Sequence, residues 1–181
     1  MEATKHTLVA LVEDRPGVLN RIASLFRRRN FNIDSIAVGR SETPHLSRVT
    51  IVVDGAPTMV EQVRKQLAKV VDVVKVVDIT NEDIVARELS LIKVKANSLT
   101  RSEIIQLVDI FRANIVDVGS DSLTIEVTGD EDKIDSLYDL LRGFGIKEVA
   151  RTGRIALTRG GGGPILIEDK ELKPAHKDIK K

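Results

Sequence analysis

The sequence predicts an α+β protein built from two tandem copies of one unit, each with the element order β-α-β-β-α-β. Strand-like apolar stretches alternate with stretches whose apolar residues recur every three or four positions, as on one face of a helix. The whole order then occurs a second time, offset by about 82 residues. At that offset, the second strand of each copy opens on a related tripeptide, Phe-Asn-Ile at 31–33 and Ala-Asn-Ile at 113–115.

In the first copy, the strands share short, mostly apolar patterns bounded by turn residues. These predicted strands are residues 7–13, 32–40, 46–54 and 73–79. A helical apolar stripe predicts the first helix over 16–29. The second helix is expected to begin near Pro57, where Thr58-x-x-Glu61 has the pattern of a capping box.

The second copy repeats these signals after a predicted linker at 80–87. Its strands are expected at 89–96, 114–118 and 123–127, with a last strand within 146–157 that is kinked at Gly153. Thr100-x-x-Glu103 predicts a capping box at the start of one helix. Asp130 and the acids after it predict the start of the other, because the helix dipole favours negative charge there.

Each copy therefore predicts a four-stranded antiparallel sheet with two helices on one face, the ferredoxin-like arrangement. The expected domains are 1–80 and 81–159. Residues 160–163 are four glycines, and no apolar stripe follows them, so 160–181 is predicted to be a flexible C-terminal tail.

Composition excludes several function classes. The 181 residues include 28 basic and 27 acidic ones, a balance that gives no electrostatic case for nucleic acid or an anionic membrane. Because there is no cysteine, disulfides, thiolate metal sites and cysteine nucleophiles are excluded. No apolar run approaches the ~20 residues of a membrane span, and no signal-peptide pattern is seen. A soluble cytoplasmic protein is expected.

No catalytic or metal-binding constellation is recognisable. The three histidines, His6, His45 and His176, fall in separate parts of the chain without a partner at metal-ligand spacing. RNA-recognition modules share this element order, but they stack bases on aromatic residues of their central strands, and here those strands contain none. The basic run at 27–29 closes a helix, where cations suit the dipole. We therefore expect no catalytic residue, no metal ligand and no nucleic-acid partner.

The segment between the first strand and the first helix carries the most information. Asp14 is a suitable N-cap residue, and Pro16 is tolerated in a first helical turn. The first-turn amides near Gly17, Val18 and Leu19 then have no intrahelical acceptor and can bind a carboxylate. Asn32, expected beside this corner, and Asp14 would complete a site for a zwitterionic amino acid. By local chemistry alone, the segment also fits a simple helix start.

Longer motifs extend this interpretation. The segments D-R-P-G-V-L-x-R-I-A-x-L-F at 14–26 and F-N-I-D-S-I-A-V-G at 31–39 resemble the ACT domain. With L-S-R-V-T-I-V-V-D at 46–54, R-E-L-S-L-I-K-V at 87–94 and E-V-A-R-T-G-R-I-A-L-x-R-G at 148–160, the chain is similar to the small regulatory subunits of acetolactate (acetohydroxyacid) synthase. The resemblance covers roughly residues 6–160 and implies that the first domain is an ACT domain.

The resemblance also implies a function. Small subunits of this family have no active site; they activate a catalytic subunit that uses thiamine diphosphate, magnesium and FAD, and they confer feedback inhibition by branched-chain amino acids, usually valine. They pair into dimers with effector sites at the interface. The effector positions carry over to Asp14, Gly17, Val18, Leu19, Asn32 and Ile33. Asp14 departs from members with Asn there, which puts effector preference in question.

The second copy lacks the Pro-Gly turn at its corresponding corner, residues 96–100. We therefore expect it to serve dimerisation or contact with the catalytic subunit rather than effector binding. The alternative function is that of another tandem-ACT amino-acid sensor, acting on a different enzyme or on transcription.

Overall fold

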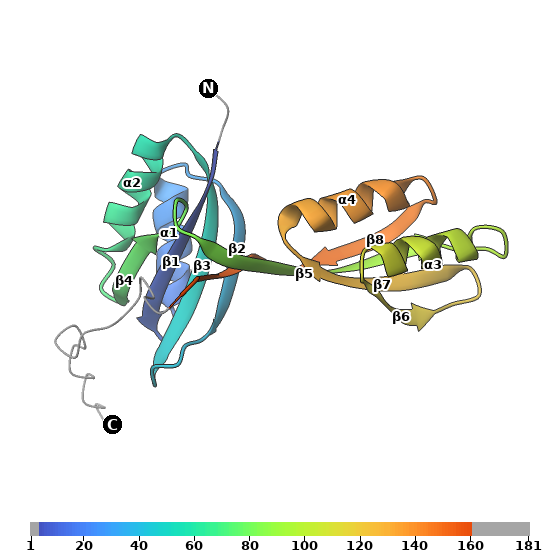
Figure 1. Ribbon diagram of the computed structural model, residues 1–181. Coiled ribbons are helices and arrows are strands. Elements are labelled where there is room, and N and C mark those ends of the chain that lie inside the picture. Colours follow the sequence, from blue (N-terminus) through green and yellow to red (C-terminus); the bar gives the residue numbers. More distant parts are fainter. Residues whose placement is uncertain (1–3, 161–181) are drawn as a thin grey trace. The chain divides into compact units, whose positions relative to one another are not determined.

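The computed structural model describes residues 4–160, which form two compact units. The first unit contains residues 4–84 together with 158–160, and the second contains residues 85–157. Each unit has two helices packed on one face of an antiparallel sheet (Figure 1). This agrees with the ferredoxin-like fold predicted for both copies. Apart from Gly160, the predicted C-terminal tail lies outside the described residues.

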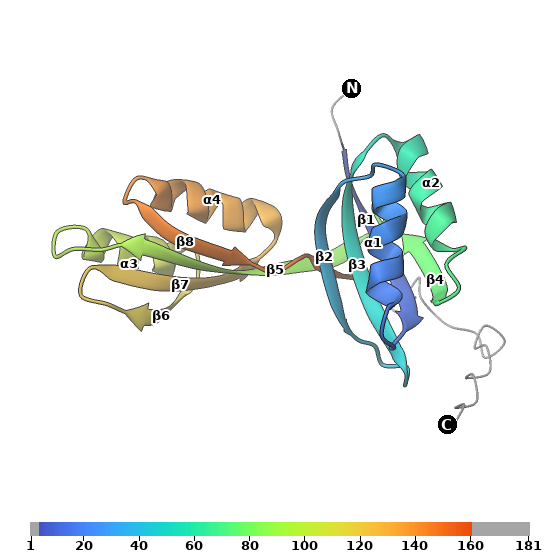
Figure 2. The same cartoon turned by 180° about the vertical axis from the view of Figure 1, so that it is seen from behind.

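The first unit follows the predicted order. Its elements are β1 (Thr4–Glu13), α1 (Val18–Arg28), β2 (Ile33–Arg40), β3 (Leu46–Gly55), α2 (Pro57–Leu67) and β4 (Val73–Asp78). The strands are arranged in the order β2-β3-β1-β4, so β2 and β4 are the edge strands. Helices α1 and α2 lie side by side on the same face (Figure 2). Apolar side chains of both helices form the core with those of β1, β3 and β4, including Leu8, Ile22, Phe26, Ile51 and Leu67.

The register of this sheet fixes which loops share an end. His6 of β1 and Ile33 of β2 both lie opposite Val53 of β3, whereas Glu13, at the end of β1, lies opposite Leu46. The beginnings of β1 and β2 are therefore level with each other. They lie at the end of the sheet opposite to the loop that follows β1, because β1 and β2 are parallel and α1 returns the chain between them.

The second unit repeats the topology. Its elements are β5 (Ile84–Lys95), α3 (Arg101–Ile110), β6 (Asn114–Val118), β7 (Ser122–Gly129), α4 (Glu131–Arg142), β8 (Ile146–Arg151) and β9 (Ile155–Thr158). The strand order is β6-β7-β5-β8, and β9 also pairs with β5. Its core includes Ile92, Ile104, Ile125, Ile134 and Leu137.

Several predicted boundaries were wrong. The expected linker at 80–87 is shorter, since β5 already begins at Ile84. The single last strand expected within 146–157 is two strands, β8 and β9, separated by residues 152–154. Arg151, the last residue of β8, and Arg154, the last residue of this break, both reach Glu88 with their side chains, and each also pairs with an acid of α4, which holds the connection in place.

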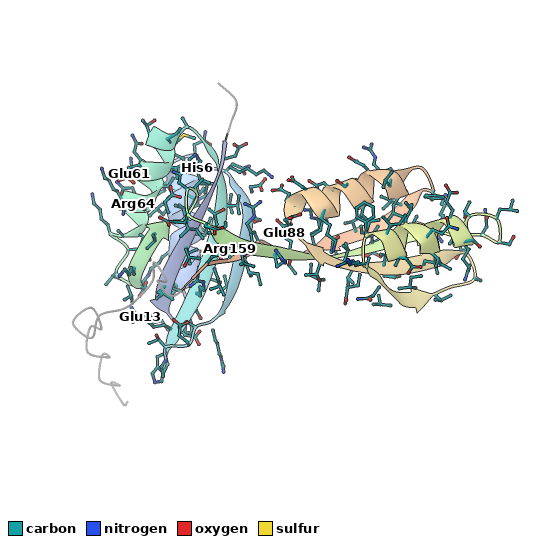
Figure 3. All side chains as sticks on the ribbon, viewed as in Figure 1. His6, Glu13, Glu61, Arg64, Glu88 and Arg159 are labelled. Carbon is teal, nitrogen blue, oxygen red and sulfur yellow. The ribbon has the colours of Figure 1, made fainter. Side chains whose placement is uncertain are left out.

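Both capping boxes were also wrong. Helix α2 begins one residue before Thr58, with Ala56 as its N-cap, and Glu61 instead pairs with Arg64 at 2.7 Å (Figure 3). Helix α3 does start at the predicted place, with Thr100 as its N-cap, but the Thr100 side chain makes no capping hydrogen bond. The prediction for Asp130 is confirmed, because its side chain accepts a hydrogen bond of 2.9 Å from the Lys133 amide.

Candidate functional site

The loop between β1 and α1 is a turn rather than the first turn of a helix. The helix begins at Val18, and Gly17 is its N-cap, with a left-handed φ of 89° and no side-chain cap. Asp14 is therefore not the N-cap that the sequence predicted. Its backbone N–H donates to the His45 carbonyl at 2.8 Å, and its exposed carboxylate has no partner among residues 4–160. The physical reason is that glycine accepts the left-handed conformation without a steric penalty, so the turn closes at Gly17.

This turn presents unoccupied donors. The first bond of α1 runs from the Arg21 N–H to the Gly17 carbonyl at 3.0 Å. Nothing in the described part of the chain accepts from the N–H groups of Gly17, Val18 or Leu19. A Cβ atom at Gly17 would have no neighbour within 4 Å, so the space beside this glycine is open. Such a helix N-terminus favours a carboxylate or another anion.

A buried carboxylate, Asp72, holds the turn in place. It directly precedes β4, and its side chain is fully buried. Arg15 of the turn donates to Asp72 Oδ1 through both Nε and Nη2, and Arg21 of α1 donates to Oδ2 at 2.5 Å. Arg15 Nε also lies 2.8 Å from a carboxylate oxygen of Glu13. Both ends of the turn are thereby tied to one acidic group.

The charge state of Asp72 follows from these contacts. Burial by itself raises the pKa of this carboxyl, but the hydrogen bonds from Arg15 and Arg21 outweigh burial and leave the pKa below its ordinary value. The hydrogen bond to Asp72 in turn raises the pKa of Arg15. The group is therefore a carboxylate bound by two guanidiniums at neutral pH.

Sequence reasoning missed Asp72, Arg15 and Arg21. Asp72 stands within the run V-V-D-V-V at 70–74, where it resembles one polar position of a strand. A lone acid flanked on both sides by pairs of valines was the available signal, because a carboxylate is rarely buried without a cationic partner. Which arginines would reach it could not be read from the spacing.

The structure places Asn32 and Ile33 away from the turn, contrary to the expectation that Asn32 lies beside it. Ile33 opens β2 and is level with His6, whereas the turn follows Glu13. Seven residue steps at ~3.3 Å per residue separate these levels, about 23 Å along β1. Figure 3 shows His6 and Glu13 at opposite ends of the strand. Within one chain, Asn32 and Ile33 therefore form one half of the predicted site, and the loop from Asp14 to Leu19 forms the other.

An exposed apolar edge lies between these two half-sites. Among residues 4–160, strand β2 has a pairing neighbour only on its β3 side. Ile36 and Val38 lie opposite Ile51 and Val49, hence on the helix-covered face, yet they are 41% and 45% exposed. Leu19, in the first turn of α1, is 48% exposed. Unpaired backbone groups next to exposed apolar side chains are a template for pairing with another chain.

The corresponding corner of the second unit has different chemistry. Asn97 Oδ1 accepts hydrogen bonds from the N–H groups of Leu99 and Thr100, at 2.9 and 3.0 Å. The Thr100 hydroxyl in turn accepts from the Asn97 N–H. The side chains of this corner thus accept hydrogen bonds from backbone N–H groups at the start of α3. The corresponding N–H groups at Gly17–Leu19 of the first unit have no acceptor among the described residues.

The remaining candidate groups do not assemble into a reactive site. Over residues 4–160, no cluster of three or more histidines and acids could hold a metal ion. His6 is buried with neither ring nitrogen hydrogen-bonded, and His45 is exposed in the β2–β3 hairpin. His176 lies outside the described residues. None of the described helices is long and apolar enough to cross a membrane.

Comparison with known proteins gives a consistent picture. Residues 8–75 match the family described as the AHAS small subunit-like ACT domain, and residues 87–160 match the family of the small subunit of acetolactate synthase. A probable acetolactate synthase small subunit of Archaeoglobus fulgidus is 58% identical over 156 residues, 86% of this chain and 98% of the relative. The acetolactate synthase small subunit of Mycobacterium bovis is 50% identical over 160 residues, 88% and 95% of the two chains.

A solved structure agrees over nearly the same length. The crystal structure of the acetolactate synthase small subunit from Thermotoga maritima superimposes with a TM-score of 0.80 at 43% sequence identity. The alignment covers 88% of this chain and 99% of that one.

Proposed function

The chain belongs to the family of acetolactate synthase small subunits, the non-catalytic regulatory subunits of that enzyme, and from this premise we propose that it activates its catalytic subunit and confers feedback inhibition by a branched-chain amino acid, with valine as the first candidate. Thiamine diphosphate, magnesium and FAD are then bound by the catalytic subunit. The complex works in the cytoplasm.

The observation that carries the proposal is the turn at residues 14–19. Its N–H groups at Gly17, Val18 and Leu19 have no acceptor among the described residues, the space beside Gly17 is open, and Arg15 of the turn is paired with Asp72. An α-carboxylate bound there would complement the N-terminus of α1. The exposed Asp14 carboxylate is available for the α-ammonium group.

The position of Asn32 supports a site shared by two copies of the chain. Asn32 and the turn are about 23 Å apart within one sheet, too far for one amino acid to bridge. A two-fold axis beside β2 would set α1 of one copy antiparallel to α1 of the other. The turn of each copy would then face Asn32 and Ile33 of its partner. The unpaired β2 edge with Ile36 and Val38 supplies the contact for such a homodimer.

The two units have separate tasks in this proposal. The first, assigned to 1–80, is the ACT domain that binds effector and dimerises. The second, assigned to 81–159, contributes to dimerisation or to contact with the catalytic subunit. At its corner, the Asn97 side chain already accepts hydrogen bonds from the N–H groups of Leu99 and Thr100, so we expect no effector to bind at that position.

The test is reconstitution with the catalytic subunit from the same organism. Acetolactate formation is measured with and without this chain, then with added valine, leucine or isoleucine. The chain alone should form no acetolactate, it should raise the rate of the catalytic subunit, and valine should inhibit only the complex. A catalytic subunit that is indifferent to the chain would refute the proposal and favour a sensor acting on another enzyme or on transcription.

A further inference from the structure

A groove between α1 and α2 has a charge that the chain as a whole lacks. It measures about 680 Å³ and is lined by ten residues, of which four are cationic and none is acidic. The cations are Arg21, Arg27, Arg28 and Lys69. Over the full sequence, basic and acidic residues nearly balance, at 28 and 27. The positive charge of the groove is therefore a local feature of the face formed by α1 and the end of α2.

Most of these cations have no partner. Arg27, Arg28 and Lys69 form no ion pair with any residue from 4 to 160. An adjoining hollow of about 480 Å³ shares Leu25, Arg28 and Gln66 with the groove and adds Arg29. The helix dipoles favour cations at the C-terminus of α1, where Arg27 and Arg28 lie, and at that of α2, which Lys69 follows. The groove brings the cations of these two helix ends together.

The groove also has an apolar side. Leu25 is buried at its floor, Val70 is half-buried, and Val71 is 60% exposed. None of the ten lining residues is aromatic, so the groove offers no surface on which nucleic-acid bases could stack. Its cations come from α1 and from the residue that follows the C-cap of α2. Spread cations around an exposed apolar side chain fit an acidic polypeptide segment with an apolar anchor.

One carboxylate connects this groove to the turn between β1 and α1. Arg21, which lines the groove, donates to Asp72 Oδ2, and Arg15 of the turn donates to Asp72 Oδ1. Asp72 itself directly follows Val71 of the groove. The turn and the groove are thus connected by two ion pairs that share the Asp72 carboxylate.

We propose that the α1–α2 groove is the surface through which this chain binds an acidic segment of its catalytic subunit, with the cations Arg27, Arg28 and Lys69 pairing with carboxylates and Val71 contacting an apolar side chain. This rests on the regulatory function proposed above and names the surface that performs it. Effector bound at the turn then reaches the catalytic subunit through Arg15, Asp72 and Arg21.

The test measures the affinity of the complete chain for the catalytic subunit from the same organism. Arg27→Glu/Arg28→Glu should weaken binding by at least about tenfold at low salt. Its affinity should also fall less steeply between ~50 and ~300 mM salt than that of the parent, because fewer cross-interface charge pairs remain to be screened. Val71→Ser should weaken binding without changing the salt dependence.

Lys65→Glu is the matched control for a single reversal, Arg28→Glu. Lys65 is an exposed cation in the last turn of α2 and does not line the groove, so both changes reverse a charge at a helix C-terminus of the same unit. The control should bind within about twofold of the parent, since exposed charges away from an interface contribute little. Thermal unfolding of each variant confirms that the first unit is folded.

Each result decides a separate point. If the parent does not bind the catalytic subunit, the proposed function fails and the assignment of the groove fails with it. If the parent binds and Arg27→Glu/Arg28→Glu binds equally well, only the assignment of the groove is overturned. A chain that ends at Gly160 tests the other candidate occupant of the groove. This is the chain's own segment 165–169 (I-L-I-E-D), which contains both acidic and apolar residues. Loss of the charge-reversal effect in that shorter chain would assign the groove to this segment instead.

Discussion

Replacing Asp72 with Asn is the sharpest test of how the turn is held. Asp72 is fully buried and accepts hydrogen bonds from Arg15 and Arg21. Asn keeps the volume of the side chain and one acceptor oxygen but removes the charge. Breaking a buried ion pair costs about 3–5 kcal/mol when the remaining charge stays buried. Here the partners' side chains are 42% and 55% exposed and can be rehydrated, so the cost should be smaller.

We therefore expect Asp72→Asn to lower the free energy of unfolding by about 2 kcal/mol, the value of lost hydrogen bonds to a charged group. For a unit of this size, that corresponds to a fall of roughly 8–16 °C in Tm. Urea titration followed by circular dichroism measures the change. Asp121→Asn is the control, because Asp121 forms a similar pair with Lys147 but is largely exposed. It should unfold like the parent.

The pH dependence gives a second test of the same reasoning. The pKa of Asp72 is lowered in the folded state, so its contribution is fully present above the unfolded value of about 3.9 and is lost as the pH falls through the lowered folded-state pKa. The stability difference between parent and Asp72→Asn should thus be constant from pH 7 to about pH 5 and shrink below about pH 4. A difference that persists unchanged in acid, or one absent at pH 7, would refute the role assigned to this carboxylate.

Three further predictions concern the proposed effector site and dimer. Gly17→Asp should abolish feedback inhibition, and because φ is 89° it should also destabilise the chain by about 1–2 kcal/mol. Gly17→Asn, of equal size and under the same backbone strain but uncharged, should retain more inhibition in the same assay, and equal inhibition curves would exclude charge repulsion. Asn32→Ala should raise the valine concentration for half-inhibition. Asn114→Ala should leave that concentration unchanged, because the Asn114 side chain donates to Glu126 within its own unit. Val38→Lys should shift sedimentation from dimer toward monomer with little loss of stability, and a variant that remains dimeric would exclude the β2 edge as the interface.

The fold was largely predictable because its signals are local and occur twice. The apolar stripes of α1 and α2 and the continuous apolar run of β1 each identify one element. The errors at the two predicted capping boxes lie where a different local contact forms instead. Thr58 and Thr100 each stand three residues before a Glu, but Glu61 pairs with Arg64 and the Thr100 hydroxyl accepts from Asn97.

The candidate site was predictable in composition and not in arrangement. The Pro-Gly turn was found, but its helix starts later because Gly17 adopts a left-handed conformation. The distance between Asn32 and the turn follows from the parallel relation of β1 and β2, which places their starts at one end of the sheet. Asp72 could not be assigned, since its arginines are 51 and 57 residues away in the sequence.

The central claim, an effector site shared between two copies of the chain, is tested most directly by mixing two defective variants. Gly17→Asp and Asn32→Ala homodimers are each impaired at every site. When the two are mixed and allowed to exchange, each heterodimer has one doubly altered site and one in which an unaltered turn faces an unaltered Asn32. Calorimetric titration with valine should then recover sites of parental affinity, up to one per heterodimer. If each site lay within a single chain, every site in the mixture would still contain one defect, and no site of parental affinity would appear.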